Sequence, residues 1–152
     1  MMFETVLHFT PVAMGRPRVT VRGRQAHAYL PKKTKAYLDT CTAVLRSQWK
    51  EEPYAGPVAV YLIFVHPRPL RLLRKRDPAG RIFKASKPDL DNLTKMANDI
   101  IVRAGVIVDD NQIVLIEARD FYGDRGEKGK TEIEVVSCSW DSQRVVSCGN
   151  EL

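Results

Sequence analysis

The pattern of hydrophobic and polar positions changes its period several times along the chain, and each change predicts an element. Alternation of apolar and polar side chains, or a short β-branched and aromatic run between glycines and prolines, is typical of a strand. This pattern predicts strands at 3–9, about 18–22, about 26–30, 58–66, 113–122 and 131–138. The run VAVYLIFVH at 58–66 has the composition of a central strand.

Apolar residues recur at helical spacing in two other segments, the first of which is 32–51. In the second, Asp91 fits the N-cap and Gly105 fits the residue that ends the helix. One apolar face of this second helix is predicted from Leu93, Met96, Ala97, Ile100, Ile101 and Ala104. The order β-β-β-α-β-α-β-β predicts an α+β fold, a mixed sheet with two helices on one face.

The segment 67–88 follows no clear period. It contains four prolines and most of the local charge, which predicts a long exposed loop or flexible hairpin. We expect one domain over 1–139 and a loose tail over 140–152.

The composition is that of an ordinary globular domain, with 44% hydrophobic and 28% charged residues. No run of 18 apolar residues occurs, so no membrane span is expected. The three cysteines are an odd count without close spacing, which favours free thiols in a reducing, cytoplasmic compartment.

The net charge of +6 is distributed unevenly. Residues 14–35 hold seven Lys/Arg and no acid, and residues 67–88 hold eight Lys/Arg against Asp77 alone. The rest of the chain is therefore net acidic. Clustered Lys/Arg predict a polyanionic partner, because they neutralise phosphates and release counterions. The alternative is a pair of solvated basic loops.

Two aspartates two residues apart stand in the basic neighbourhood of KPDLDNLTK, residues 87–95. An extended chain points residues i and i+2 the same way, so Asp89 and Asp91 can face one point. Lys95 lies one helical turn beyond Asp91 on the same polar line. A helix-start acid is more often a cap than a ligand, and that interpretation stays open for this pair on its own.

A second acidic pair, Asp109 and Asp110, follows the second helix. That helix, 91–105, climbs about 21 Å, and the five residues 106–110 can run back about 17 Å. The geometry therefore permits three or four carboxylates to meet near the start of the helix.

Carboxylates brought together repel one another and need a cation. Oxygen ligands favour Mg²⁺, or Mn²⁺ in its place, over zinc, and the three histidines are scattered singly. A divalent ion beside basic segments suits phosphodiester hydrolysis, with Lys95 orienting water or stabilising the transition state. VIVDD lacks the P-loop that a Walker B strand requires, because GDRGEKGKT has Asp124 where the motif needs glycine.

Together KPDLDNLTK, the amphipathic helix, GVIVDDNQI and the upstream GRPR resemble the RusA family of Holliday-junction resolvases, from about residue 5 to 138. The resemblance implies a small α+β homodimer that uses Mg²⁺ to cut four-way DNA junctions by paired symmetrical nicks. It places the family's catalytic residues on Asp89, Asp91, Lys95 and Asp110. It adds Asp109 as a neighbouring metal ligand, and Asp99 matches an acid of the family helix.

The basic segments supply the residues expected to contact branched DNA, namely Arg16, Arg18, Lys32, Lys33, Arg71, Arg74, Lys75, Arg76, Arg81, Lys84 and Lys87. Two other functions compete with junction resolution. One is an endonuclease that acts on flaps or forks, and the other is a non-catalytic nucleic-acid-binding protein whose acids are structural.

Overall fold

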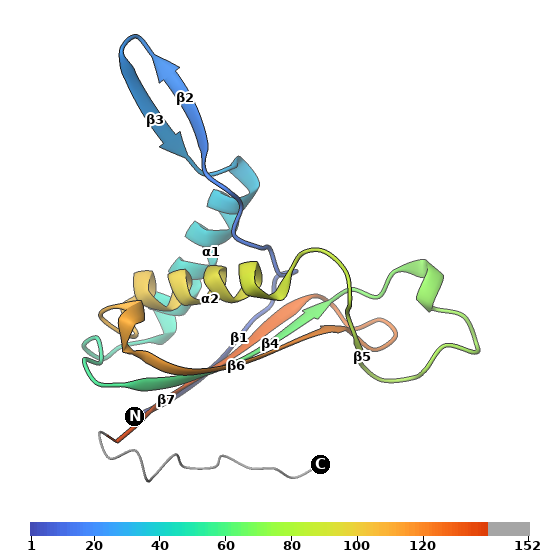
Figure 1. Cartoon of the computed structure of the whole chain (residues 1–152). Coiled ribbons are helices and arrows are strands. Elements are labelled where there is room, and N and C mark those ends of the chain that lie inside the picture. Colours follow the sequence, from blue (N-terminus) through green and yellow to red (C-terminus); the bar gives the residue numbers. More distant parts are fainter. Residues whose placement is uncertain (140–152) are drawn as a thin grey trace.

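The computed structural model describes residues 1–139, and the predicted tail at 140–152 lies outside the described residues. The elements, in chain order, are β1 (Met2–Leu7), β2 (Arg18–Arg22), β3 (Gln25–Tyr29), α1 (Lys32–Gln48), β4 (Val58–His66), η1 (Leu70–Leu72), β5 (Ile82–Phe83), α2 (Leu90–Ala104), η2 (Asp110–Gln112), β6 (Ile113–Tyr122) and β7 (Lys130–Ser137). Both α-helices lie on the same face of one mixed sheet, which confirms the predicted α+β architecture (Figure 1).

The main sheet has five strands in the order β1-β7-β4-β6-β5. β4 pairs parallel with β6 and antiparallel with β7, so it is the central strand that its composition predicts. A parallel pair needs a crossover connection, and the segment that contains α2 supplies it between β4 and β6.

The core lies between the sheet and the helices. Alternate residues of β4, including Val60 and Leu62, join the buried cluster on the helix side. The predicted apolar stripe of α2 is confirmed, because all six of its residues are at most 4% exposed. α1 packs against α2 and contributes Leu38 and Leu45 to the same core.

The sequence predicted one end of α2 correctly and the other wrongly. Gly105 ends the helix with a φ of 80°, a left-handed conformation that glycine adopts without strain. The prediction of Asp91 as N-cap is wrong, because Asp89 holds that position in an extended conformation (φ −76°, ψ 143°). The Asp89 carbonyl accepts the Leu93 N–H at 3.2 Å, so Leu90 is already helical and Asp91 lies in the first turn.

The segment 67–88 is the long and largely exposed loop that was predicted, and it forms the lobe that carries η1 and β5 (Figure 1). Arg68, only 8% exposed, holds it in place. Its guanidinium donates to the carbonyls of Gly123 (2.9 Å), Pro78 (2.7 Å) and Gly80. A side chain that binds backbone carbonyls in this way leaves no periodic signal in the sequence, so the pattern could not reveal these contacts.

β2 and β3 pair only with each other and form a two-stranded ribbon that projects away from the body (Figure 1). The predicted strand pieces near 18–22 and 26–30 are thus confirmed, outside the main sheet. None of the helices in the described part of the chain combines the length and apolar character that crossing a membrane requires.

Candidate active site

The start of α2 presents two carboxylates and an ammonium group to solvent. Lys95 Nζ lies 3.2 Å from Asp91 Oδ2, which confirms the predicted polar line along the helix. Both side chains are about two-thirds exposed, at 64% and 66%. The Asp89 side chain makes no capping hydrogen bond, although it occupies the N-cap position. Its carboxylate oxygens are therefore not taken up by the backbone N–H groups of the helix end.

A buried lysine fixes the segment that leads into Asp89. Lys84 Nζ donates to the carbonyls of Ser86 (2.7 Å) and Pro88 (3.2 Å) and lies 2.9 Å from Asp120 Oδ2. His66 Nε2 stands 3.1 Å from the other oxygen of Asp120. The side chains of Lys84 and Asp120 are 3% and 7% exposed.

This burial departs from the expectation that Lys84 faces DNA. The ammonium group points inward because β5 pairs with β6 and brings Lys84 against the Asp120 backbone and carboxylate. The structure gives Lys84 a positioning role instead. It holds the chain immediately before the first aspartate.

An open hollow of about 600 Å³ lies along this segment, between the β5–β6 edge and the start of α2. Asp89 lines it together with Lys87, Ser86 and Arg119. Sequence reasoning missed Arg119, an exposed cation on β6 that has a neighbouring Glu117 as ion-pair partner. Its place in a strand gives no signal that it borders the same hollow as Asp89.

The Asp109–Asp110 loop is held by one glutamine. Gln112 Oε1 accepts the N–H groups of Val108 (2.8 Å) and Asp109 (2.9 Å). Its Nε2 donates to the carbonyls of Tyr54 (2.9 Å) and Gly56 (2.7 Å). These four hydrogen bonds use the whole amide group and fix the backbone that carries the second acidic pair.

The carboxylates of this loop interact with each other and with Asp99. The Asn111 N–H donates to Asp109 at 3.0 Å and lowers the pKa of that carboxyl group. The hydrogen bond with Asp109 raises the pKa of Asp110, and the charge of Asp99 raises it further. η2, which begins at Asp110, packs against α2, the helix that carries Asp99.

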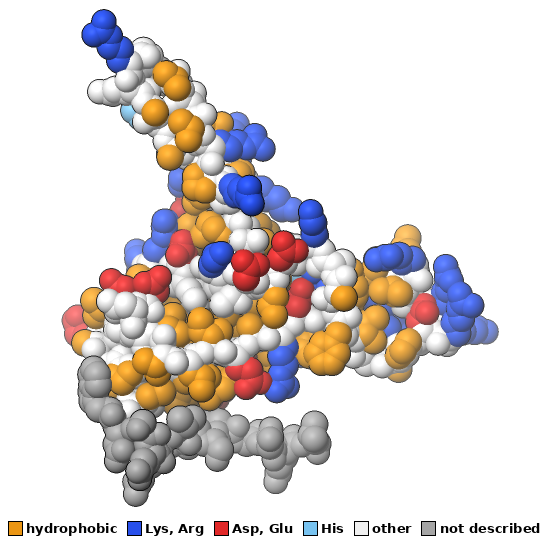
Figure 2. Space-filling model, viewed as in Figure 1, with side chains coloured by type: hydrophobic (Ala, Val, Ile, Leu, Met, Phe, Trp, Pro, Cys, Tyr) orange, Lys and Arg blue, Asp and Glu red, His pale blue; other side chains and the backbone are white. Residues whose placement is uncertain are grey.

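The predicted cluster of three or four carboxylates is not formed within residues 1–139, where no three His, Cys, Asp or Glu side chains are grouped to hold a metal ion. Asp99 lies eight residues beyond Asp91, about 12 Å along the helix. Among the acidic side chains visible in Figure 2, one group lies over the start of α2 and another lies near η2. The chain after Gly105 does not run straight back, because Ile107 pairs with Tyr54.

The donor chemistry at the start of α2 still fits a hard cation. Mg²⁺ is commonly held by one or two carboxylates together with waters and substrate phosphates, without a complete cage of protein ligands. Asp89 and Asp91 supply two exposed carboxylates of that kind. Neither residue offers the sulfur or imidazole ligands that zinc prefers.

The residues predicted to contact DNA divide into two sets. Arg81 forms ion pairs with Glu127 and Glu132, both at 2.8 Å, and Lys84 is buried as described. The other nine are exposed and have no ion-pair partner among the residues that the structure describes: Arg16, Arg18, Lys32, Lys33, Arg71, Arg74, Lys75, Arg76 and Lys87.

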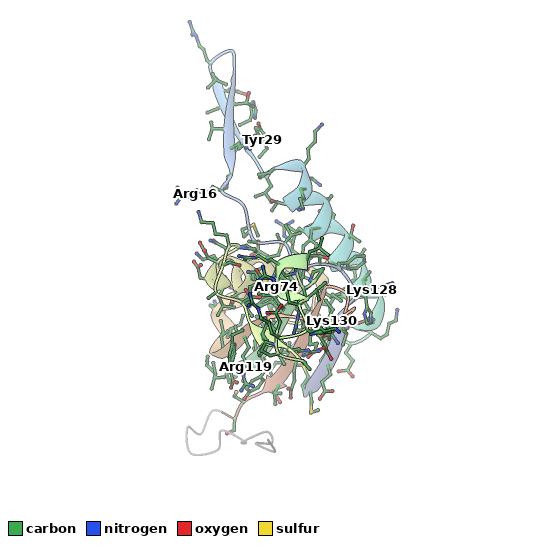
Figure 3. All side chains as sticks on the ribbon, turned by 90° about the vertical axis from the view of Figure 1, so that its right-hand side faces the viewer. Arg16, Tyr29, Arg74, Arg119, Lys128 and Lys130 are labelled. Atoms are coloured by element: carbon green, nitrogen blue, oxygen red, sulfur yellow. The ribbon has the colours of Figure 1, made fainter. Side chains whose placement is uncertain are left out.

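These exposed cations form two basic surfaces, one on the ribbon with the start of α1 and one on the loop lobe. Figure 2 shows the acidic group at the start of α2 between them. Figure 3 looks onto the loop, where Arg74 is labelled, and shows the ribbon with Arg16 and Tyr29 standing clear of the body. The candidate site is thus a pair of carboxylates flanked by cations.

Comparison with known proteins gives this arrangement a family. The model of the endodeoxyribonuclease RusA family matches residues 8–136, which include both acidic groups and both basic surfaces. The chain belongs to the RusA family. Its membership confirms the resemblance drawn from the motifs and makes the chain an endodeoxyribonuclease.

Two relatives of this RusA family member show how far the similarity extends. The uncharacterized protein YqaN of Bacillus subtilis (strain 168) is 32% identical over 120 residues, which cover 75% of this chain and 83% of YqaN. The crossover junction endodeoxyribonuclease rusA of Lactococcus phage r1t is 42% identical over 53 residues, which cover 35% of this chain and 38% of the phage protein.

Proposed function

We propose that this RusA family member resolves four-way DNA junctions in recombination and repair, by Mg²⁺-dependent nicking of opposing strands. The observation that carries the proposal is the pair Asp89 and Asp91, exposed at the start of α2 and flanked by two basic surfaces. Mn²⁺ can substitute for Mg²⁺ because both take oxygen ligands. Action in the cytoplasm agrees with the free thiols at Cys41 and Cys138.

In this proposal each group at the site has a separate task. Asp89 and Asp91 hold the ion, which supplies charge stabilisation and an activated water when it is bound. Lys95, paired with Asp91 at 3.2 Å, stabilises the negative charge that develops on the phosphate. Asp109 and Asp110 complete the acidic surface from the other end of the helix.

We propose a homodimer as the acting form. A four-way junction with two-fold symmetry needs two cuts in opposing strands, and a pair of identical subunits related by a two-fold axis presents two sites with matching symmetry. The same reasoning gives the junction, instead of a flap or fork, as the preferred substrate.

The test is a cleavage assay on synthetic four-way junctions, on flaps and forks, and on linear duplex of the same sequence. With Mg²⁺ the wild type should nick opposing strands of the junction and leave the linear duplex largely uncut. Asp91→Asn should abolish cleavage and keep binding, since it removes a carboxylate ligand without adding bulk. Asp39→Asn is the matched control, because the ion pair of Asp39 with Lys35 lies on the exposed side of α1.

Four results would count against the proposal, each against a different part. Equal cutting of linear duplex contradicts junction selectivity, and preferential cutting of flaps or forks gives the protein a different branched substrate. Normal cleavage by Asp91→Asn contradicts the site. No cleavage of any branched DNA with Mg²⁺ or Mn²⁺ would leave nucleic-acid binding as the function.

A further inference from the structure

The β2–β3 ribbon is a feature that the cleavage chemistry does not use. It stands clear of the body, and the strand residues whose side chains are described are all exposed. A two-stranded ribbon in isolation is at best marginally stable in water. A surface of this shape is typical of an arm that is completed by a binding partner.

The two faces of the ribbon differ in chemistry. Val19 pairs with Ala28 and Val21 with Ala26, so these four small apolar side chains share one face. Figure 2 shows apolar side chains along the ribbon on the face of the molecule where the acidic group of α2 is also visible. Arg18, Thr20, Gln25, His27 and Tyr29 lie on the opposite face by the same register.

Charge decides between the possible partners. The segment 14–35 that contains the ribbon has seven Lys/Arg and no acid. Packing two such ribbons together would bring two strongly basic segments into contact, which like-charge repulsion opposes. Two valines and two alanines are also far too little surface for a stable dimer, which buries about 1,200–2,000 Å². A polyanion suits both the charge and the small side chains.

The base of the ribbon is fixed to the candidate active site. The Met14 N–H donates at 2.9 Å to the carbonyl of Asn92, the residue after Asp91. Gly15 packs so closely on the start of α1 that a Cβ there would stand 3.0 Å from Thr34 Oγ1. Both helices therefore hold the ribbon base, and its direction is set relative to the two aspartates.

We propose that the β2–β3 ribbon is a DNA-binding arm that lies along a groove of one duplex arm of the branched substrate. Its small apolar face contacts sugars and base edges, and the flanking arginines contact phosphates. A two-stranded ribbon fits the major groove of B-DNA, which is about 12 Å wide. This inference rests on the proposed function for its substrate.

The reach of the ribbon sets where it touches the DNA. Nine residues, 15–23, extend from the Met14 hydrogen bond to the turn, so the tip stands at most about 30 Å from Asn92 at ~3.3 Å per residue. That length corresponds to about nine base pairs at 3.4 Å each. The arm therefore contacts duplex within about nine base pairs of the phosphodiester that is cut.

The experiment shortens the ribbon and the DNA independently. Replacing residues 20–27 by Asn-Gly joins Val19 to Ala28, which are direct cross-strand partners, through a two-residue hairpin turn. Binding is measured without Mg²⁺ on junctions whose hairpin-capped arms have about 15 or about 5 base pairs, longer and shorter than the reach. A second variant, Arg24→Ala, removes one cation at the turn, and Lys128→Ala removes an exposed cation elsewhere as its matched control.

On the long-armed junction the shortened ribbon should raise Kd at least about tenfold, equivalent to 1.4 kcal/mol, and on short arms it should bind like the wild type. Arg24→Ala should lower the slope of log K against log salt by about 0.9, as expected for one phosphate contact. Lys128→Ala should leave the affinity unchanged.

Equal long-arm affinity of the shortened ribbon and the wild type, or of Arg24→Ala and Lys128→Ala, would overturn the proposal. So would a wild-type dimer that becomes a monomer when the ribbon is shortened, because the ribbon would then join two copies of the chain. The proposed function is tested separately, by Mg²⁺-dependent cleavage of the long-armed junction by the wild type. Ribbon-dependent binding without cleavage refutes that function and leaves the arm in place.

Discussion

Lys84→Met is the substitution that most directly tests how the candidate site is held. It keeps the length of the side chain and removes the ammonium group that lies 2.9 Å from Asp120 Oδ2. Asp120, 7% exposed, would then be a buried carboxylate without its lysine. Removal of one partner from a buried ion pair costs about 3–5 kcal/mol. Since about 1 kcal/mol shifts Tm by roughly 2–4 °C in a domain of this size, we expect Tm to fall by roughly 10 °C.

A double variant separates stability from positioning. Lys84→Met with Asp120→Leu replaces the whole buried pair by apolar side chains, which is often neutral or stabilising. We therefore expect its unfolding free energy to return to within about 1–2 kcal/mol of the wild type. The carbonyls of Ser86 and Pro88 still lack their donor in this variant. Cleavage should stay low because the segment before Asp89 is no longer fixed.

Urea unfolding and single-turnover cleavage of a four-way junction provide the two measurements, and Lys35→Met is the matched control. Lys35 pairs with Asp39 on an exposed helix face, where an ion pair contributes about 0–1 kcal/mol. If Lys84→Met costs no more than Lys35→Met, the pair does not stabilise the fold as argued. If the double variant cleaves at the wild-type rate, Lys84 does not position Asp89.

Three further predictions concern the parts around the site. Gln112→Ala removes four hydrogen bonds to backbone groups. At ~1 kcal/mol for each bond, urea unfolding should show that the free energy of unfolding falls by about 2–4 kcal/mol. A fall of less than about 1 kcal/mol would contradict the role of the glutamine. Arg74→Ala with Arg76→Ala should weaken junction binding and lower its salt slope by about 2, whereas an unchanged slope would remove both residues from the DNA interface. Arg81 holds the pKa of Glu127 at about 2, below its usual 4.5. The stability from this pair is thus present above pH 4.5 and lost as the pH falls towards 2. In urea unfolding, Glu127→Gln should therefore be less stable than the wild type by on the order of 1 kcal/mol at pH 7 and equally stable near pH 2. A constant difference in unfolding free energy across that range would refute the linkage.

Periodicity predicted the regular elements because their signal is local. β4 and β6 have the predicted bounds, 58–66 and 113–122, since continuous β-branched and aromatic runs define them. β5 escaped prediction because a two-residue strand, Ile82–Phe83, has no period to detect. The loop around it is held by Arg68, whose carbonyl partners lie up to 55 residues away.

The contacts of the candidate site likewise divide into local ones, which the sequence predicts, and ones between distant residues, which it does not. Asp91 and Lys95 lie one helical turn apart, so their contact follows from helix geometry alone. Lys84 and Asp120 are 36 residues apart and meet only because β5 pairs with β6. Chain length permitted Asp110 to reach the start of α2, but Ile107 pairs with Tyr54, and the cluster with Asp89 and Asp91 does not form within residues 1–139. The length of the connecting chain limits how far a residue can lie from the helix, and the pairing of distant segments decides where it lies within that limit.

The first turn of α2 is where the basic segments and the acids are joined. The loop segment reaches it through Lys84, which donates to the Pro88 carbonyl directly before Asp89. The ribbon segment reaches it through Met14, which donates to the Asn92 carbonyl directly after Asp91. Each of the two basic segments, 14–35 and 67–88, is therefore hydrogen-bonded to one side of the first turn of α2. In the proposed function, this arrangement places DNA bound to either basic surface at a fixed position relative to the two carboxylates.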